Sequence, residues 1–143
     1  MTLAITRRYR FPAAHVLRHP GLSDAENERI YGKCANPHGH GHDYGLELRV
    51  EGPVDPRTGW IVPPDVLDEL VRERVLGRLG HRLLNEDPLF RDRVPTAENI
   101  AIVVHEALAD AVARSTGARL ARVRVVETPR NHFDYDGDAE EAR

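Results

Sequence analysis

The chain has 143 residues and a formal net charge of −3, from 20 basic and 23 acidic side chains, which excludes a broadly basic protein that binds nucleic acid or anionic membranes. Hydrophobic residues make up 41% of the chain, so one domain over residues 1–143 can bury a core. The single cysteine, Cys34, excludes an intramolecular disulfide, and no apolar run suits a signal peptide or a membrane span. We therefore expect a cytoplasmic protein.

Alternation of apolar and polar residues predicts the first strands. Period two holds from Leu3 to His15 and again from Tyr44 to Glu51, and each stretch is typical of a strand. The polar, turn-rich segment Arg18–Gly32 between them is expected to be a loop. The turn cluster Gly52–Gly59 leads into Trp60–Val62, which is expected to be a short third strand in a hairpin.

Helical spacing follows in the second half of the chain. Asp65 is the expected N-cap of a helix to about Leu79, and Thr96 that of a second helix that ends at Gly117. Two further strands are predicted over 121–125 and 131–135, before an acidic tail from about residue 136 that we expect to be solvated. This order predicts an α+β domain whose helices pack on one face of a largely antiparallel sheet.

Histidines gather in the segment from Cys34 to His42, which also contains His38 and His40. His40 and His42 are two residues apart and share parity with the apolar face of the second strand, and His15 shares parity with the apolar face of the first. Three imidazoles can bind one zinc ion and leave its fourth position open, as in catalytic zinc sites.

Two other interpretations of this segment stay open from the residues alone. Cys34 could be a fourth ligand and close a structural site, or the segment could bind no metal. Parity does not separate the pair His38 and His40 from the pair His40 and His42.

Six segments in one order resemble the family of 6-pyruvoyl- and 6-carboxytetrahydropterin synthases, which are zinc-dependent pterin enzymes. They cover nearly the whole chain: Phe11–His15, Cys34–Tyr44, Val54–Ile61, His81–Asn85, Pro95–Asn99 and Glu127–Thr128. The resemblance implies the tunnelling fold (T-fold), in which a small antiparallel sheet carries two helices on one face. It also implies a homo-oligomer, commonly a hexamer, in which the sheets of the subunits form a ring-like barrel.

By this resemblance His15, His40 and His42 are the zinc ligands, and Cys34 and His81 are catalytic. The implied activity is that of a carbon–oxygen lyase that converts 7,8-dihydroneopterin triphosphate to 6-carboxy-5,6,7,8-tetrahydropterin or 6-pyruvoyl-tetrahydropterin with loss of triphosphate. A Cys34 thiolate near the cation would take a proton from carbon.

Two segments point to different products of the family. Val54–Ile61 resembles the 6-carboxy branch of 7-deazapurine (queuosine) biosynthesis, and this resemblance favours the 6-carboxy product. The spacing from Cys34 to His40 is more similar to that of the pyruvoyl-forming branch.

Three further polar residues match family motifs for pterin binding. Glu127 keeps the parity of the preceding apolar residues, so its carboxylate should face the apolar side, where it could accept the adjacent amino group and ring N–H of a pterin. An ion pair with an arginine is the alternative. Thr96 and Glu98 could help to bind the pterin, or could cap the helix and complement its dipole.

The chain departs from the family pattern at two places. Gly80 stands where relatives usually have an aspartate before the histidine, and Pro63 and Pro64 replace an acidic and an aromatic residue. Loss of the carboxylate should weaken His81 as an acid or base. The alternatives are therefore a divergent paralogue with an altered pterin-like substrate, a non-catalytic oligomer that binds zinc or pterin, and a zinc hydrolase that uses metal-bound water.

Overall fold

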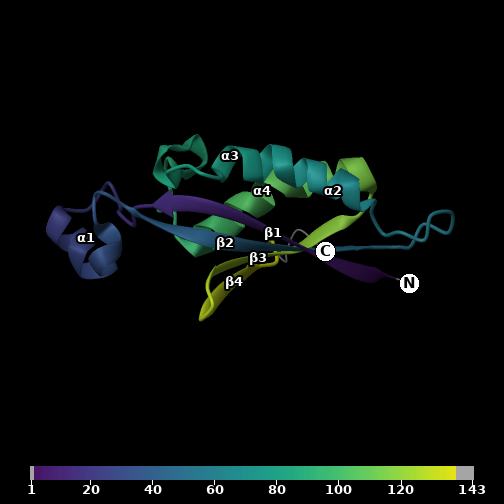
Figure 1. Ribbon diagram of the computed structural model, residues 1–143, viewed down its shortest axis with the longest axis horizontal. Helices are drawn as coiled ribbons and strands as arrows, with labels where there is room; N and C mark the ends of the chain where they lie inside the picture. The colour runs from purple at the N-terminus through teal and green to yellow at the C-terminus, as the bar shows by residue number, and fades with distance from the viewer. Residues whose placement is uncertain (1, 138–143) are drawn as a thin grey trace.

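A four-stranded antiparallel sheet forms one layer of the protein. The computed structural model describes residues 2–137, and the sheet has the order β1-β2-β3-β4, with β1 (Leu3–His15), β2 (His40–Gly52), β3 (Arg119–Thr128) and β4 (Asn131–Tyr135). Figure 1 shows both long helical segments on the same face of this sheet. The predicted α+β class is confirmed, whereas most of the predicted acidic tail lies outside the described residues.

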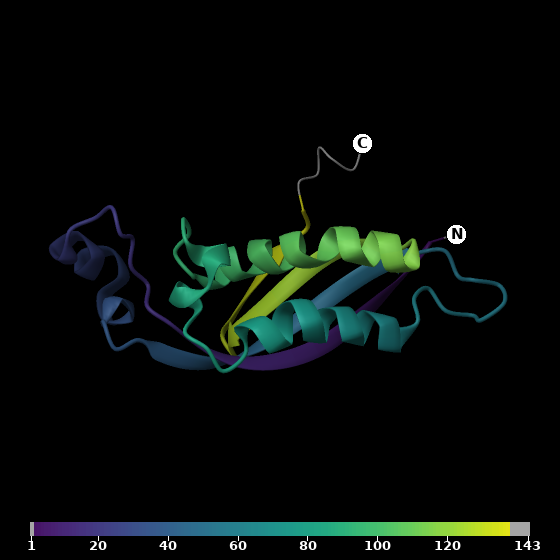
Figure 2. The same cartoon turned by 90° about the horizontal axis from the view of Figure 1, so that it is seen from above.

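Two helical segments cover the sheet side by side, as Figure 2 shows from above. The first comprises α2 (Pro64–Val71), a π-helical turn η2 (Arg72–Leu76) and α3 (Gly77–Leu79). The second is α4 (Ala97–Thr116). No helix within residues 2–137 is long and apolar enough to cross a membrane.

The ends of α4 follow the prediction, whereas the start of α2 does not. The Thr96 side chain accepts a hydrogen bond from the Asn99 N–H, and Gly117 adopts the left-handed conformation that ends the helix. Asp65 was expected to be the N-cap of α2, but it lies inside the first turn because Pro64, which has no N–H to lose, begins the helix.

The core lies between the sheet and the two helical segments. Every second residue of the strands points toward the helices, and the opposite face carries charged side chains. Large side chains in this core are fully buried: Phe11, Tyr44, Leu46, Leu48, Leu67, Leu79, Leu84, Ile100 and Leu108. This apolar layer stabilises the strand ends that carry the histidines.

The segment predicted to be a loop contains a helix, α1 (Asp24–Tyr31), which projects beyond the sheet (Figure 1). Ser23 and Glu26 form a capping box at its start. Asn27 is fully buried and donates to the carbonyls of His19, Leu22 and Ser23. The prediction was wrong because α1 has no apolar stripe, and a buried amide orders the segment instead.

The predicted third strand over Trp60–Val62 is also absent from the sheet. The Asp55 N–H donates to the Trp60 carbonyl and the Gly59 N–H to the Asp55 carbonyl, so this segment closes a loop. A hairpin with β2 cannot form, because β1 and β3 already occupy both edges of that strand.

Residues 81–83 run beside the free edge of β1 after the helical segment ends. The His81 N–H donates to the Pro12 carbonyl at 2.6 Å and the Ala14 N–H donates to the Arg82 carbonyl at 2.9 Å. Two 3-10 turns, η3 (Leu84–Glu86) and η4 (Pro88–Phe90), then lead back toward α4. This path brings the His81 segment alongside the strand that carries His15.

Candidate metal centre

Three histidines come together where β1 and β2 meet. His15 and His40 are direct partners in the antiparallel register, and His42, opposite Ala13, lies on the same face. The ring centroids are 4.5 Å apart for His15 and His40, 5.0 Å for His40 and His42, and 5.2 Å for His15 and His42. One nitrogen from each ring lies within 4.8 Å of the others. These three residues could hold a metal ion.

A backbone carbonyl fixes the orientation of the buried His15 ring. Nδ1 of His15 lies 2.7 Å from the Pro95 carbonyl oxygen, which can only accept, so Nδ1 carries the proton. The Tyr44 hydroxyl lies 3.1 Å from the same nitrogen. Nε2 is therefore left with its lone pair toward the cluster, 2.8 Å from Nε2 of His40. Such an outer-shell hydrogen bond is usual for metal-ligating histidines.

Burial keeps two of the three imidazoles neutral. Desolvation is the main cause that lowers the pKa of His15 and of His40, and the neighbouring histidines lower both further. A neutral imidazole is the form that binds a metal. Three imidazole nitrogens fit zinc, which accepts Zn–N bonds of about 2.0–2.1 Å and retains an open position in a three-histidine site.

Cys34 and His38 lie outside this cluster. Within residues 2–137 the metal-competent group contains no cysteine, and Cys34 lies half-buried in the 3-10 turn η1 (Gly32–Ala35). His38 is exposed, and its N–H donates to the Asn36 side chain. The geometry thus favours the pair His40 and His42 over a pair that includes His38, and it does not support a fourth ligand from Cys34.

Asn85 holds the backbone just after His15, a contact that sequence reasoning missed. Its side-chain oxygen accepts from the Val16 N–H at 2.8 Å, and its amide donates to the Val16 carbonyl at 2.9 Å. The Cys34 carbonyl accepts from the Leu17 N–H at 2.8 Å. A side-chain amide can form the same pair of hydrogen bonds that a neighbouring strand would form. Hydrophobic periodicity in the sequence does not predict such a contact.

Glu127 lies near the cluster, as its parity predicts. It is half-buried at the end of β3, and its charge acts on His15, His40 and Tyr44: it opposes the lowering of both histidine pKa values and adds to the effect of burial that raises the pKa of Tyr44. No ion pair of Glu127 is found within the described residues, so the carboxylate stays available to a ligand.

The two residues at the start of α4 differ in their surroundings. Thr96 is half-buried, follows the carbonyl that orients His15, and caps the helix. Glu98 is exposed in the first turn, where a carboxylate interacts favourably with the helix dipole. The capping role predicted for Thr96 is confirmed, and pterin binding by either residue stays a prediction.

His81 lines a cavity that reaches the histidine cluster. The cavity measures about 530 Å³ and is lined by His42, Asp43, His81 and Arg82, among others. His81 is exposed and is the one non-glycine residue between positions 2 and 137 with a positive φ, of 60°. Such backbone strain is common at functional sites. No contact joins His81 to Cys34 within the described part of the chain.

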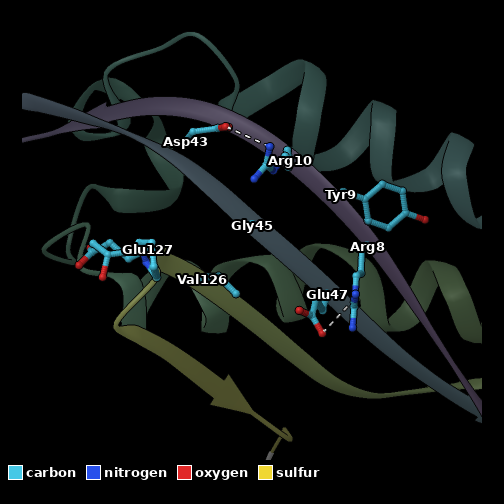
Figure 3. Close-up of a pocket in the computed structure, with 10 residues that line it drawn as sticks. Arg8, Tyr9, Arg10, Asp43, Gly45, Glu47, Val126 and Glu127 are labelled. Atoms are coloured by element: carbon cyan, nitrogen blue, oxygen red, sulfur yellow. Dashed lines mark ion pairs between the residues drawn. The ribbon is translucent and has the colours of Figure 1, made fainter.

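A second cavity, of about 710 Å³, lies on the charged face of the sheet (Figure 3). Gly45 and Val126 form its floor, and Glu127 lies at one end. Arg8 and Arg10 extend from β1, where they face Glu47 at 3.7 Å and Asp43 at 3.8 Å. It is lined by none of the three clustered histidines.

The fold and the site together define a small α+β protein with three clustered histidines, which could hold a metal ion, at one end of its sheet. Residues 4–138 match the family model described as 6-pyruvoyl tetrahydropterin synthase. The chain therefore belongs to the 6-pyruvoyl tetrahydropterin synthase family.

Individual relatives agree with this assignment. The chain is 39% identical to 6-pyruvoyl tetrahydrobiopterin synthase of Drosophila melanogaster, over 93% of this chain and 79% of that protein. The identity to the Homo sapiens protein is 37%, over 94% and 91% of the two chains. The solved structure of Caenorhabditis elegans 6-pyruvoyl tetrahydropterin synthase superimposes with a TM-score of 0.89 at 37% identity and covers 96% of this chain and 97% of that one. These results confirm the resemblance and the T-fold.

Proposed function

We propose that the chain is a zinc-dependent carbon–oxygen lyase that converts 7,8-dihydroneopterin triphosphate to 6-pyruvoyl-tetrahydropterin with loss of triphosphate. The observation that carries the proposal is the three-histidine cluster in a chain that belongs to this family. The imidazoles of His15, His40 and His42 would hold the ion. Bound there, zinc would polarise a side-chain oxygen of the substrate and stabilise negative charge that develops beside it.

The remaining roles fall to protein groups around the cluster. Glu127 would accept hydrogen bonds from the amino group and ring N–H of the pterin, which two carboxylate oxygens can do at once. Thr96 and Glu98 would border the same ring from the start of α4. Cys34, as a thiolate, would take a proton from carbon, and His81 would assist proton transfer.

We further propose that the protein works as a homo-oligomer, with a hexamer expected for the family. Within residues 2–137 no strand pairs with the outer edge of β1 from Leu3 to Phe11, and β4 is the other edge of the sheet. Exposed strand edges pair readily with other strands. Light scattering should give a mass several times that of one chain, and a monomer would contradict this part of the proposal.

The 6-carboxy product is the second candidate, because Val54–Ile61 resembles that branch of the family. The Drosophila melanogaster and Homo sapiens relatives are 6-pyruvoyl tetrahydrobiopterin synthases, which favours the pyruvoyl product. Product mass separates the two, and a 6-carboxy product would retain the lyase while changing its branch.

The test is incubation of zinc-loaded protein with 7,8-dihydroneopterin triphosphate, followed by mass analysis and a triphosphate assay. Cys34→Ser should retain zinc and abolish release of triphosphate. A zinc hydrolase that uses metal-bound water would survive this substitution. Binding of pterin without turnover by the wild-type protein would contradict the lyase and favour a binding role.

A further inference from the structure

Arg82 is an exposed cation beside the three clustered histidines. It lines both the cavity of about 530 Å³ that reaches His42 and a neighbouring cavity of about 580 Å³. Its guanidinium forms no ion pair within residues 2–137. Arg78, four residues earlier, differs, because Asp87 holds that guanidinium through two hydrogen bonds of 2.9 and 3.0 Å, whereas the charge of Arg82 acts on Asp87 without a direct ion pair.

The backbone of Arg82 is fixed relative to the histidines. Its carbonyl accepts from the Ala14 N–H, one residue before His15, and Ala14 is the register partner of Gly41, which lies between His40 and His42. The base of the side chain is therefore anchored, while the residue as a whole is exposed. An anchored arginine loses less conformational entropy when it binds a ligand than one on a mobile loop.

We propose that Arg82 binds the triphosphate group of the substrate, and the triphosphate that is released from it. The proposal rests on the lyase activity proposed above and names the residue that receives the leaving group. A guanidinium presents a planar fork of N–H donors that matches two phosphate oxygens. A substrate with its side chain at the histidines would extend its polyanion through the cavity toward this fork.

The other arginines near a cavity are less suited to a polyanion. Arg8 and Arg10 face carboxylates of their own, and their cavity also contains Glu127 (Figure 3). Carboxylates outnumber arginines there, so a triphosphate would be repelled. On the Arg82 side, Arg78 and Arg82 line the cavity of about 580 Å³ together with Asp87 and Glu86. Arg78 neutralises Asp87, so Glu86 is the carboxylate there without an ion pair within the described residues. Its charge should weaken binding of an anion at Arg82.

These charges give substitutions with opposite expected signs. We would titrate inorganic tripolyphosphate into zinc-loaded protein by calorimetry. Arg82→Gln should weaken binding roughly tenfold or more, because a charge-assisted hydrogen-bond pair is lost. Arg82→Lys should retain part of the affinity as a point charge. Glu86→Gln should tighten binding of tripolyphosphate a few-fold, because it removes a negative charge that lines the same cavity as Arg82.

Two controls separate phosphate binding from a structural effect. Arg114→Gln removes the same charge in the last turn of α4, away from these cavities, and should leave the affinity for tripolyphosphate unchanged. Arg82→Gln should also leave the affinity for 7,8-dihydroneopterin, which has no phosphate, unchanged. Equal tripolyphosphate affinities for Arg82→Gln and Arg114→Gln would overturn the proposal. Loss of dihydroneopterin affinity or of oligomer mass in Arg82→Gln would overturn it as well.

The tripolyphosphate titration does not depend on turnover, so the proposed lyase activity and the proposed role of Arg82 can be rejected independently. Lyase activity with the same KM in the wild-type protein and in Arg82→Gln would reject the role of Arg82 and retain the lyase. Tripolyphosphate binding through Arg82 in a protein without turnover would reject the lyase and retain a phosphate site.

Discussion

Gly80 occupies a position at which a side chain does not fit. A Cβ atom built there would lie 2.6 Å from the Leu76 carbonyl oxygen, a backbone atom, whereas real Cβ contacts essentially never fall below 3.0 Å. Gly80→Ala must therefore displace the end of the helix by about 0.4 Å or more. Overpacking of this kind typically costs about 1–3 kcal/mol, and the lower entropy of the unfolded chain offsets about 0.4–1 kcal/mol.

We expect Gly80→Ala to lower the free energy of unfolding by about 1–2 kcal/mol, and Tm by roughly 3–8 °C. Gly80→Asp should be destabilised at least as much. It should also fail to raise kcat, although it restores the carboxylate that relatives have before this histidine, because the shift disturbs the hydrogen bond between the His81 N–H and Pro12. The measurements are thermal unfolding and steady-state kinetics with 7,8-dihydroneopterin triphosphate.

Gly77→Ala is the matched control in the same helical segment. Its Cβ would lie 3.0 Å from the Arg72 carbonyl, and alanine gains about 1 kcal/mol of helix propensity over glycine. We expect little change in Tm. The steric reasoning would be refuted by a Gly80→Ala variant at least as stable as the wild-type protein, or by a higher kcat in Gly80→Asp.

Three further predictions concern the metal, acid stability and the α1 segment. His42→Ala should weaken zinc binding by more than about a hundredfold, whereas His38→Ala should retain zinc, as metal analysis after dialysis would show; the reverse would mean that the wrong histidines were assigned. The hydrogen bonds from Arg7 lower the pKa of the Asp68 carboxyl in the folded protein below its value near 4 in the unfolded chain. The ionised carboxylate therefore stabilises the fold at any pH above the pKa of the unfolded chain. This stabilisation is lost as the pH falls through the lower pKa of the folded protein. The stability difference between wild type and Asp68→Asn should therefore be present at pH 7 and shrink in acid unfolding below about pH 4, and a constant difference would contradict it. Asn27→Ala leaves buried backbone groups without partners and should lower stability by about 2 kcal/mol or more, with Tm lower by roughly 4–8 °C; an unchanged Tm would show that the buried amide is not needed.

Local patterns predicted most of the sheet and the longest helix. Period-two alternation gave β1 from Leu3 to His15 without error, because side chains alternate between the faces of any strand. Thr96 and Gly117 marked the ends of α4, because each satisfies backbone groups that a helix end leaves free. These signals depend on neighbouring residues alone, so they can be read without knowledge of the fold.

The incorrect predictions involve elements that distant contacts decide. The residues of Trp60–Val62 are typical of a strand, but β2 already pairs with β1 and β3, so neither of its edges is free to pair with this segment. The helix α1 depends on Asn27, whose polar side chain gives no hydrophobic signal while it holds three backbone carbonyls. The π-helical turn η2 likewise has no periodic signature in an otherwise regular apolar stripe.

The sequence by itself determined that His15, His40 and His42 face the apolar side of the sheet, because the parity of a residue along a strand is a local property of the backbone. Only the tertiary structure decided that His15 lies opposite His40 and that Pro95, 80 residues away along the chain, directs the lone pair of His15 toward the cluster. Strand register and such long-range contacts depend on which side chains pack between the sheet and the helices. Residues from all parts of the chain contribute to this packing, so a local sequence pattern does not predict it.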